Sequence, residues 1–289
     1  PAVPAAPMTA VTPWHYFPDH EVVFWRSDWT PAATAIAFKA GPPEGHATAR
    51  LMREIPDWHF SAGHAHPDAN SFIVYADGSY GTGDTGYAGL PMTAHHNTVL
   101  FGGRGQAREG QGHDVFDGVP YSRMDSIRIA EVRLGPGFAY IRGEAAAAYE
   151  PELGVERFSR VFHLTSPRRI VVCDELRARR PTTFTSLLHA DRSITPVDGR
   201  AFTLGGSAGE LRATLVSPAR VDARVEPNVV TAPGQPGSVD KGERQERGSR
   251  LAASTGPATA ARFVTVLETG AGSAAPLPAG GECPRPPAR

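Results

Sequence analysis

The sequence has little cysteine, no long apolar run and no excess of charge of either sign. Its 289 residues include only Cys173 and Cys283 as cysteines, and 29 Lys and Arg against 30 Asp and Glu. This balance argues against a protein that binds nucleic acid or an anionic membrane through bulk charge, because such binding needs a basic excess. Since no apolar run approaches the roughly 20 residues of a spanning helix, we expect no membrane insertion. The two cysteines permit a disulfide but do not determine the compartment.

Helical segments are also scarce. The only good helical stretch is 144–150 (EAAAAYE), which is too short to organise a fold. The 31 glycines and 27 prolines suit many short strands joined by turns. The sequence therefore predicts an all-β fold, a large antiparallel β-sandwich. The candidate strands cover residues 22–25, 33–38, 71–75, 79–82, 98–101, 126–134, 138–142, 155–164, 169–173, 182–189, 210–216 and 262–267.

Composition divides the chain into three parts. Residues 1–19 begin with a Pro/Ala-rich stretch and are predicted to be a linker in extended conformation. Residues 20–270 are predicted to form the sandwich. Within them, 227–260 are rich in Gly, Ser, Pro and charge, which favours a long mobile loop. Residues 271–289 are Ala/Gly/Pro-rich and are predicted to be a disordered tail.

Five of the eleven histidines fall between positions 59 and 96. In an extended segment, side chains two residues apart point to the same face, so His64 and His66 can converge on one site. Asp84 follows the hairpin turn signalled by Asp77-Gly78, and His96 begins the next strand. Two imidazoles and a carboxylate suit Zn²⁺ with water in an open position. The alternative is that these are ordinary histidines exposed at strand ends.

The order and spacing of several motifs resemble the heparinase II/III family of polysaccharide lyases. The resemblance covers residues 20–190 well and the remainder only in its β character. It rests on Arg26-Ser27-Asp28-Trp29, the run from Gly63 to Phe72 (GHAHPDANSF), Tyr75-Ala76-Asp77-Gly78, Asp84-Thr85-Gly86-Tyr87, and His96-Asn97-Thr98-Val99-Leu100.

The resemblance implies a role for particular residues. It makes His66, Asp84 and His96 ligands of a structural Zn²⁺ and His64 the catalytic residue. Two further residues are candidates for binding the substrate by their own chemistry: Arg26 could pair its planar guanidinium with a sugar carboxylate or sulfate, and Tyr87 lies in a loop near the histidines and could line the cleft. An Arg beside Asp28 is also a common surface ion pair, and Tyr87 could equally pack within its loop.

The same resemblance implies the reaction and the partners. Family members cleave acidic polysaccharides that contain uronic acid, such as heparin, heparan sulfate or alginate, by β-elimination. They join an N-terminal (α/α) toroid to a C-terminal β-sandwich, and the toroid supplies further catalytic groups. This chain resembles only the sandwich, so we expect it to be the C-terminal part of a longer protein whose toroid is its partner. The family also implies export to the periplasm or cell envelope, or secretion.

Two other hypotheses remain open at this point. The chain could be a non-catalytic, metal-stabilised carbohydrate-binding module. It could also be a zinc hydrolase that uses metal-activated water, although the sequence has no His-Glu-x-x-His motif and no obvious Glu base near the candidate ligands.

Overall fold

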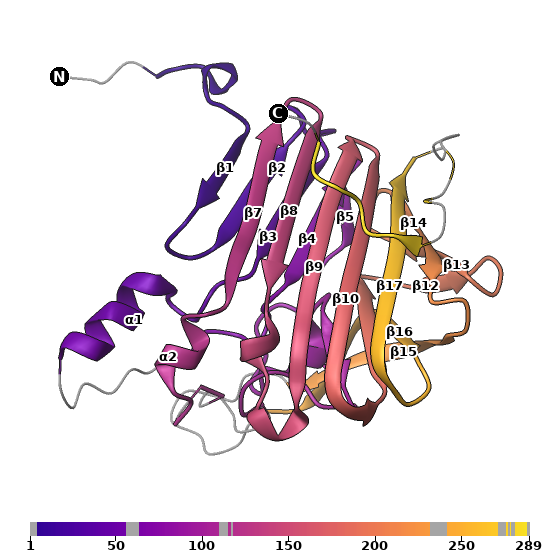
Figure 1. Ribbon diagram of the computed structural model, residues 1–289. Coiled ribbons are helices and arrows are strands. Elements are labelled where there is room, and N and C mark those ends of the chain that lie inside the picture. The colour runs from indigo at the N-terminus through magenta and orange to yellow at the C-terminus, as the bar shows by residue number, and fades with distance from the viewer. Residues whose placement is uncertain are drawn as a thin grey trace.

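The computed structural model describes residues 5–55, 64–109, 115–116, 118–231, 242–270, 276, 278 and 281–287. In this part of the chain the strands form two layers, and the fold is the expected all-β antiparallel sandwich (Figure 1). The front layer in Figure 1 is one eight-stranded sheet in the order β12-β13-β14-β17-β10-β9-β8-β7. Its strands are β7 (Arg128–Gly135), β8 (Phe138–Glu144), β9 (Val155–Ser166), β10 (Arg169–Thr182), β12 (Ile194–Pro196), β13 (Ala201–Gly205), β14 (Glu210–Ser217) and β17 (Ala258–Thr269).

The second layer consists of two separate sheets. One is the five-stranded sheet β1-β2-β3-β4-β5 and the other is the four-stranded sheet β15-β16-β11-β6. The first contains β1 (Trp14–Phe17), β2 (Val22–Arg26), β3 (Ala35–Lys39), β4 (Ser71–Ala76) and β5 (Ser79–Thr82). The second contains β6 (Val99–Phe101), β11 (Phe184–Ala190), β15 (Asp222–Thr231) and β16 (Arg244–Ser254). The chain passes from the first sheet to the second between β5 and β6.

Alternation along the strands builds the core between the layers. In β9, Phe158, Phe162 and Leu164 face the second layer and are fully buried. Facing them, β4 contributes Phe72, whose ring centroid lies 5.0 Å from that of Phe162. The turn between β4 and β5 is the predicted Asp77-Gly78, and both residues have positive φ, as a tight two-residue hairpin requires.

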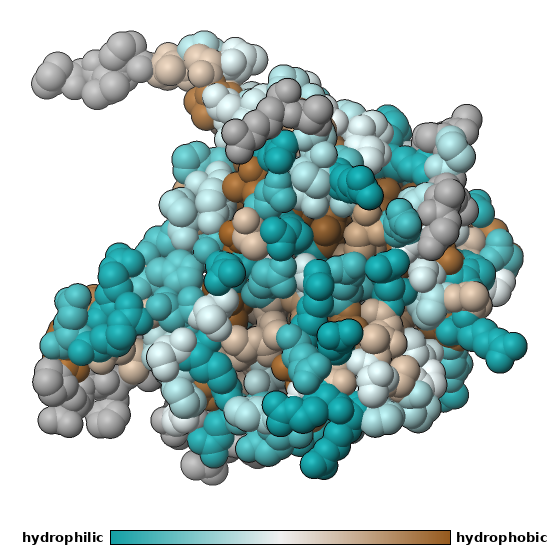
Figure 2. Space-filling model, in the orientation of Figure 1, coloured by the Kyte–Doolittle hydropathy of each residue, from teal (hydrophilic) through white to brown (hydrophobic). Residues whose placement is uncertain are grey.

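The outer face of the eight-stranded sheet carries a smaller apolar cluster that the end of the chain covers. Cys173 lies in this cluster, which also contains Tyr140, Val161, Val171, Val264 and Val266. Cys283 packs against it and forms a disulfide with Cys173, with 5.4 Å between the Cα atoms. The C-terminal segment crosses the front of the sheet in Figure 1, and Figure 2 shows mostly hydrophilic side chains over the rest of that face.

Several segments differ from the sequence prediction. The predicted linker contains β1, which pairs with β2. Most described residues of the predicted mobile loop, 227–260, belong to strands. β15 and β16 pair with each other, and Arg250 Nη2 lies 2.8 Å from Glu226 Oε2 across the pair. Within the predicted disordered tail, residues 281–287 are described: Pro284 and Pro287 accept hydrogen bonds from Tyr140 and Arg133.

The helical elements are short, and some of their residues, such as Met124 and Ala148, reach the core. They are α1 (Gly45–Glu54), α2 (Tyr121–Met124) and 3-10 turns at Met8–Ala10, Thr93–His95, Ala146–Ala148 and Pro151–Leu153. The predicted helical stretch 144–150 gives only one of these turns, because Ala145, Ala148 and Tyr149 are buried against the core. Helix α1 was not predicted. Its first turn is held by a residue far away in the sequence: the Asp19 side chain accepts a hydrogen bond from Ala47 N–H, and the Asp19 carbonyl accepts one from His46 N–H.

Candidate active site and metal site

The predicted site residues gather on loops at one end of the second layer. His64 and His66 precede β4, Asp84 follows β5, and His96 follows the Thr93–His95 turn before β6. The site therefore spans the seam between the five-stranded and four-stranded sheets. One further histidine of the sequence cluster, His59, lies outside the described residues.

His66, Asp84 and His96 are neighbours, as the spacing predicts. The rings of His66 and His96 lie 5.2 Å apart between centroids. His96 Nδ1 lies 3.1 Å from Asp84 Oδ2, and the other carboxylate oxygen of Asp84 accepts from the backbone N–H of Gly86. The carboxylate thus holds both the His96 ring and its own loop.

The electrostatics of these three groups keep the carboxylate charged and His66 neutral. Burial lowers the pKa of His66, and a positive charge on His96 would lower it further. Burial alone would raise the pKa of Asp84, but the hydrogen bond and the charge of His96 lower it to about 2. Neutral imidazole and ionised carboxylate are the forms in which these residues bind metal ions.

The donor set fits a metal ion in type, and one atom in it lacks a partner. With Nδ1 directed at Asp84, His96 leaves Nε2 buried and without a hydrogen-bond partner in the described structure. A buried polar atom without a partner is costly, and a cation would satisfy it. Within the described residues, however, no three His, Cys, Asp or Glu side chains are already arranged to hold a metal ion.

His64 and Tyr87 form a pair beside this group. Tyr87 Oη lies 3.0 Å from His64 Nδ1, and the two rings stack with centroids 5.7 Å apart. Tyr87 also lies 6.1 Å from the His66 ring, and its side chain is exposed. Arg247 on β16 donates to the carbonyls of Thr85 and Tyr87 and so holds the Tyr87 loop. His64 is therefore an exposed imidazole with an oriented ring.

Arg26 does not belong to this group. It pairs in register with Ala35, which pairs with Tyr75, whereas the site loops leave the sheet at the opposite end, where Lys39 pairs with Ser71. Ala35 and Lys39 are four positions apart on β3, so the two ends of the strand are separated by about 13 Å. Arg26 Nε and Nη2 donate to the carbonyls of Asp28 and Thr30. The structure thus brings Tyr87 to His64 and keeps Arg26 apart.

Asn97 ties the site loops together. Its amide nitrogen donates to Phe72 O at the start of β4 and to Gly83 O just before Asp84, at 2.8 and 2.7 Å. Its amide oxygen accepts from the backbone N–H of His189 on β11. One buried side chain thus connects both sheets of the second layer. Its position beside His96 in the motif was visible in the sequence, but its partners are 14 to 92 residues away.

A buried ion pair on the large sheet supports the same loops from below. Arg160 on β9 and Asp174 on β10 are register partners, and the guanidinium contacts both carboxylate oxygens at 2.6 and 2.7 Å. Arg160 Nη1 also donates to the carbonyls of Asn70 and Asn97. Local pattern does not reveal this pair, because its members are 14 residues apart and meet only through strand register. The strand predicted to end at residue 173 continues through Asp174 to Thr182 as β10.

His189 is a structural residue of the site. Its ring contacts Asn97 Oδ1 and the carbonyl of Ala94, and it is fully buried. Burial lowers its pKa to about 3, so it is neutral at pH 7. His95, the neighbour of His96, is also buried, and burial together with the His96 charge lowers its pKa to about 4.

The comparisons with known proteins agree with the resemblance in the sequence. The family model described as heparinase II/III-like, C-terminal, matches residues 10–255. Heparan sulfate lyase HepC from Pedobacter heparinus has a similar structure, with a TM-score of 0.64 and 16% identity, over 91% of this chain and 37% of that one. A structure of heparinase III gives a TM-score of 0.63 and 13% identity, over 91% and 37%. The chain therefore spans little more than a third of the length of these structures.

Proposed function

This chain belongs to the heparinase II/III-like C-terminal family, and from that premise we propose that it is the sandwich part of a lyase that cleaves acidic, uronate-containing polysaccharide by β-elimination. The observation that carries the proposal is the exposed, oriented His64–Tyr87 pair beside His66, Asp84 and His96. The described residues contain no helix that is long and apolar enough to cross a membrane. The Cys173–Cys283 disulfide favours an oxidising compartment such as the periplasm or the exterior.

In the proposed reaction His64 is the acid–base residue that this chain supplies. A base removes the proton α to the uronate carboxylate, the 4-O bond breaks, and a C4–C5 double bond forms as the leaving oxygen takes up a proton. His64 suits proton transfer because an imidazole can both accept and donate a proton through its ring nitrogens. Tyr87 Oη lies 3.0 Å from Nδ1 and orients the ring. The remaining acid–base group and the clamp on the sugar carboxylate would come from the N-terminal toroid.

We propose that His66, Asp84 and His96 hold Zn²⁺, which would brace the loops that carry His64. The partnerless His96 Nε2 and the lowered pKa of His66 support this assignment. Purified protein should contain about one equivalent of zinc by elemental analysis, and added Zn²⁺ should raise the melting temperature of chelator-treated protein. His66→Ala and His96→Ala should lose both effects, whereas the exposed-site control His15→Ala should keep them. Metal-free protein with no zinc-dependent melting shift would disprove the zinc site.

The lyase is tested with the chain joined to its upstream region. Incubation with heparan sulfate or alginate should yield an ultraviolet-absorbing unsaturated uronate, His64→Ala should abolish it, and His15→Ala should not. The chain alone should yield none, because the toroid groups are needed. No product from the longer protein, with saccharide binding retained, would instead indicate a non-catalytic carbohydrate-binding module.

A further inference from the structure

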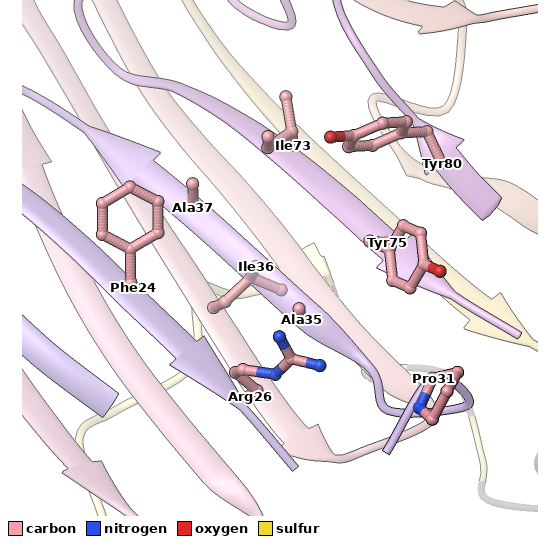
Figure 3. A pocket seen from close by; sticks show the side chains of 9 residues that line it. All are labelled: Phe24, Arg26, Pro31, Ala35, Ile36, Ala37, Ile73, Tyr75 and Tyr80. Carbon is pink, nitrogen blue, oxygen red and sulfur yellow. The ribbon is translucent and has the colours of Figure 1, made fainter. Parts of the chain in front are cut away.

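The outer face of the five-stranded sheet carries a groove that is separate from the histidine site. It has a volume of about 310 Å³ and is lined by Phe24, Arg26, Pro31, Ala35, Ile36, Ala37, Ile73, Tyr75 and Tyr80, here called the outer groove (Figure 3). Its shape follows from the register, in which the small side chains of Ala35 and Ala37 on β3 face the groove, while Ile36 between them is buried in the core. The longer side chains of β2 and β4 stand on either side.

The walls of the outer groove are aromatic and exposed. Phe24 on β2 is 51% exposed and Tyr80 on β5 is 46% exposed. Tyr75 lies edge-on to Tyr80, with ring centroids 5.6 Å apart. Large aromatic side chains on an exposed sheet face are unfavourable unless they serve contacts, and their flat apolar faces suit the C–H faces of sugar rings.

The charge in the outer groove is positive only. Arg26 is its one charged lining residue, and it is held in place by the carbonyls of Asp28 and Thr30 and by the Trp29 ring, 5.0 Å away. Its Nη1 has no hydrogen-bond partner among the residues that the structure describes. A guanidinium that is positioned by backbone carbonyls and keeps a free edge is prepared to bind a carboxylate or sulfate.

The outer groove also leads toward the histidine site. The outward positions of β3 are Ala35, Ala37 and Lys39, so the floor ends at a lysine about 13 Å from Arg26. Lys39 on β3 lies at the opposite end of the floor from Arg26 on β2, and its Nζ lies 2.6 Å from Asp68 Oδ1. The apolar floor thus has a cation near each end, on neighbouring strands.

We infer that the outer groove is a second saccharide-binding site, which holds an acidic oligosaccharide with an acidic group on Arg26 and sugar rings against Phe24 and Tyr80. The acidic saccharide is taken from the proposed function, but the groove does not require catalysis. It would retain polymer outside the cleft and present it along β3 toward the histidine loops.

The test measures binding of alginate and heparan sulfate oligosaccharides to the chain by calorimetry and by NMR shifts. Arg26→Gln should weaken binding about tenfold, the effect of one charge-assisted hydrogen bond, and Phe24→Ala or Tyr80→Ala by a similar factor. The matched controls Arg224→Gln and Val197→Ala, which are exposed elsewhere, should bind as the parent does. A neutral oligosaccharide should bind at least tenfold more weakly than the acidic ones.

Each other outcome overturns the inference. Parent-like binding by all three groove variants, equal binding of the neutral oligosaccharide, or no binding to the parent chain excludes the site. So does a concentration-dependent increase in mass that the groove variants abolish, because the groove would then hold a second copy of the chain. His64→Ala should leave groove binding unchanged. Binding without lyase activity in the longer protein would refute the proposed function and retain the second site.

Discussion

Replacing Asp174 with alanine should be among the most damaging single changes in the protein. The side chains of Arg160 and Asp174 are only 1% and 2% exposed, so Asp174→Ala leaves a guanidinium buried without its counter-charge. Breaking a buried pair in this way costs about 3–5 kcal/mol of the free energy of unfolding. The change should be measured by urea denaturation monitored by fluorescence, with the slope of the transition compared between variants.

A matched control lies on the same pair of strands. Glu175, the next residue on β10, faces outward and pairs with Arg157 and Arg262, and its side chain is 31% exposed. Glu175→Ala should cost less than about 1 kcal/mol, as expected for a surface ion pair. If Asp174→Ala proves no more destabilising than Glu175→Ala, the argument from burial is wrong.

The double variant Arg160→Met with Asp174→Leu separates the ion pair from its contacts to the site. It contains no unpaired charge, so it avoids the cost of burying the guanidinium without its counter-charge. The carbonyls of Asn70 and Asn97 would still lose the donor that Arg160 supplies, at about 1–3 kcal/mol for each buried acceptor. Hydrogen exchange should therefore remain faster in the two site loops than in the parent. Full protection there would show that Arg160 does not position them.

Four further predictions concern pH, packing and the end of the chain. Burial lowers the pKa of His189 to about 3, so below pH 6.5 the unfolded chain binds this proton more readily than the folded chain. The free energy of unfolding should therefore decrease as pH falls from about 6.5 toward 3, by up to about 1.4 kcal/mol per pH unit. His189→Gln should reduce this slope. Burial alone would lower the pKa of His46, but hydrogen bonds to Asp125 and Glu21 raise it. The contribution of His46 to stability should therefore be complete below pH 6.5 and disappear as pH rises through the folded-state pKa. An NMR titration of His46 and a comparison with His46→Gln check this. Gly143→Ala places a Cβ 2.0 Å from Asn70 Oδ1 and should cost about 1–3 kcal/mol, whereas Gly199→Ala, with open space around it, should be neutral in thermal melts. Cys283→Ser opens a link between residues 110 positions apart and should cost about 4–5 kcal/mol in unfolding under oxidising conditions, with no difference from the parent in reductant.

Local pattern predicted most of the sandwich and much of the site. Strands with an apolar face, such as β4 with its Asp77-Gly78 turn, carry their signal in their own residues. Strands with few buried apolar residues do not: β15 and β16 are held by partners such as Glu226 and Arg250, and their composition resembles a loop. Helix α1 is capped by Asp19, 28 residues before Ala47, so no local signal marks its start.

The site shows the same division. The resemblance that named His64, His66, Asp84 and His96 rests on short contiguous motifs, and the structure brings these residues together. The residues that hold them there, Asn97 and the Arg160–Asp174 pair, act across distances of up to 92 positions in the chain and were not found. Arg26 was a candidate for binding the substrate because its planar guanidinium can pair with a sugar carboxylate or sulfate, but register places it beside Ala35, at the end of β3 away from the site.

The division of the second layer into two sheets makes the site sensitive to the motion of one sheet against the other. His66 and Asp84 are attached to the five-stranded sheet, while His96 leads directly into the four-stranded one. A small rotation about the seam would alter the separation of the two imidazoles before it disturbed any strand pairing. A domain or a long polymer that packs across both sheets would therefore also change how well these residues are placed to hold the proposed zinc ion.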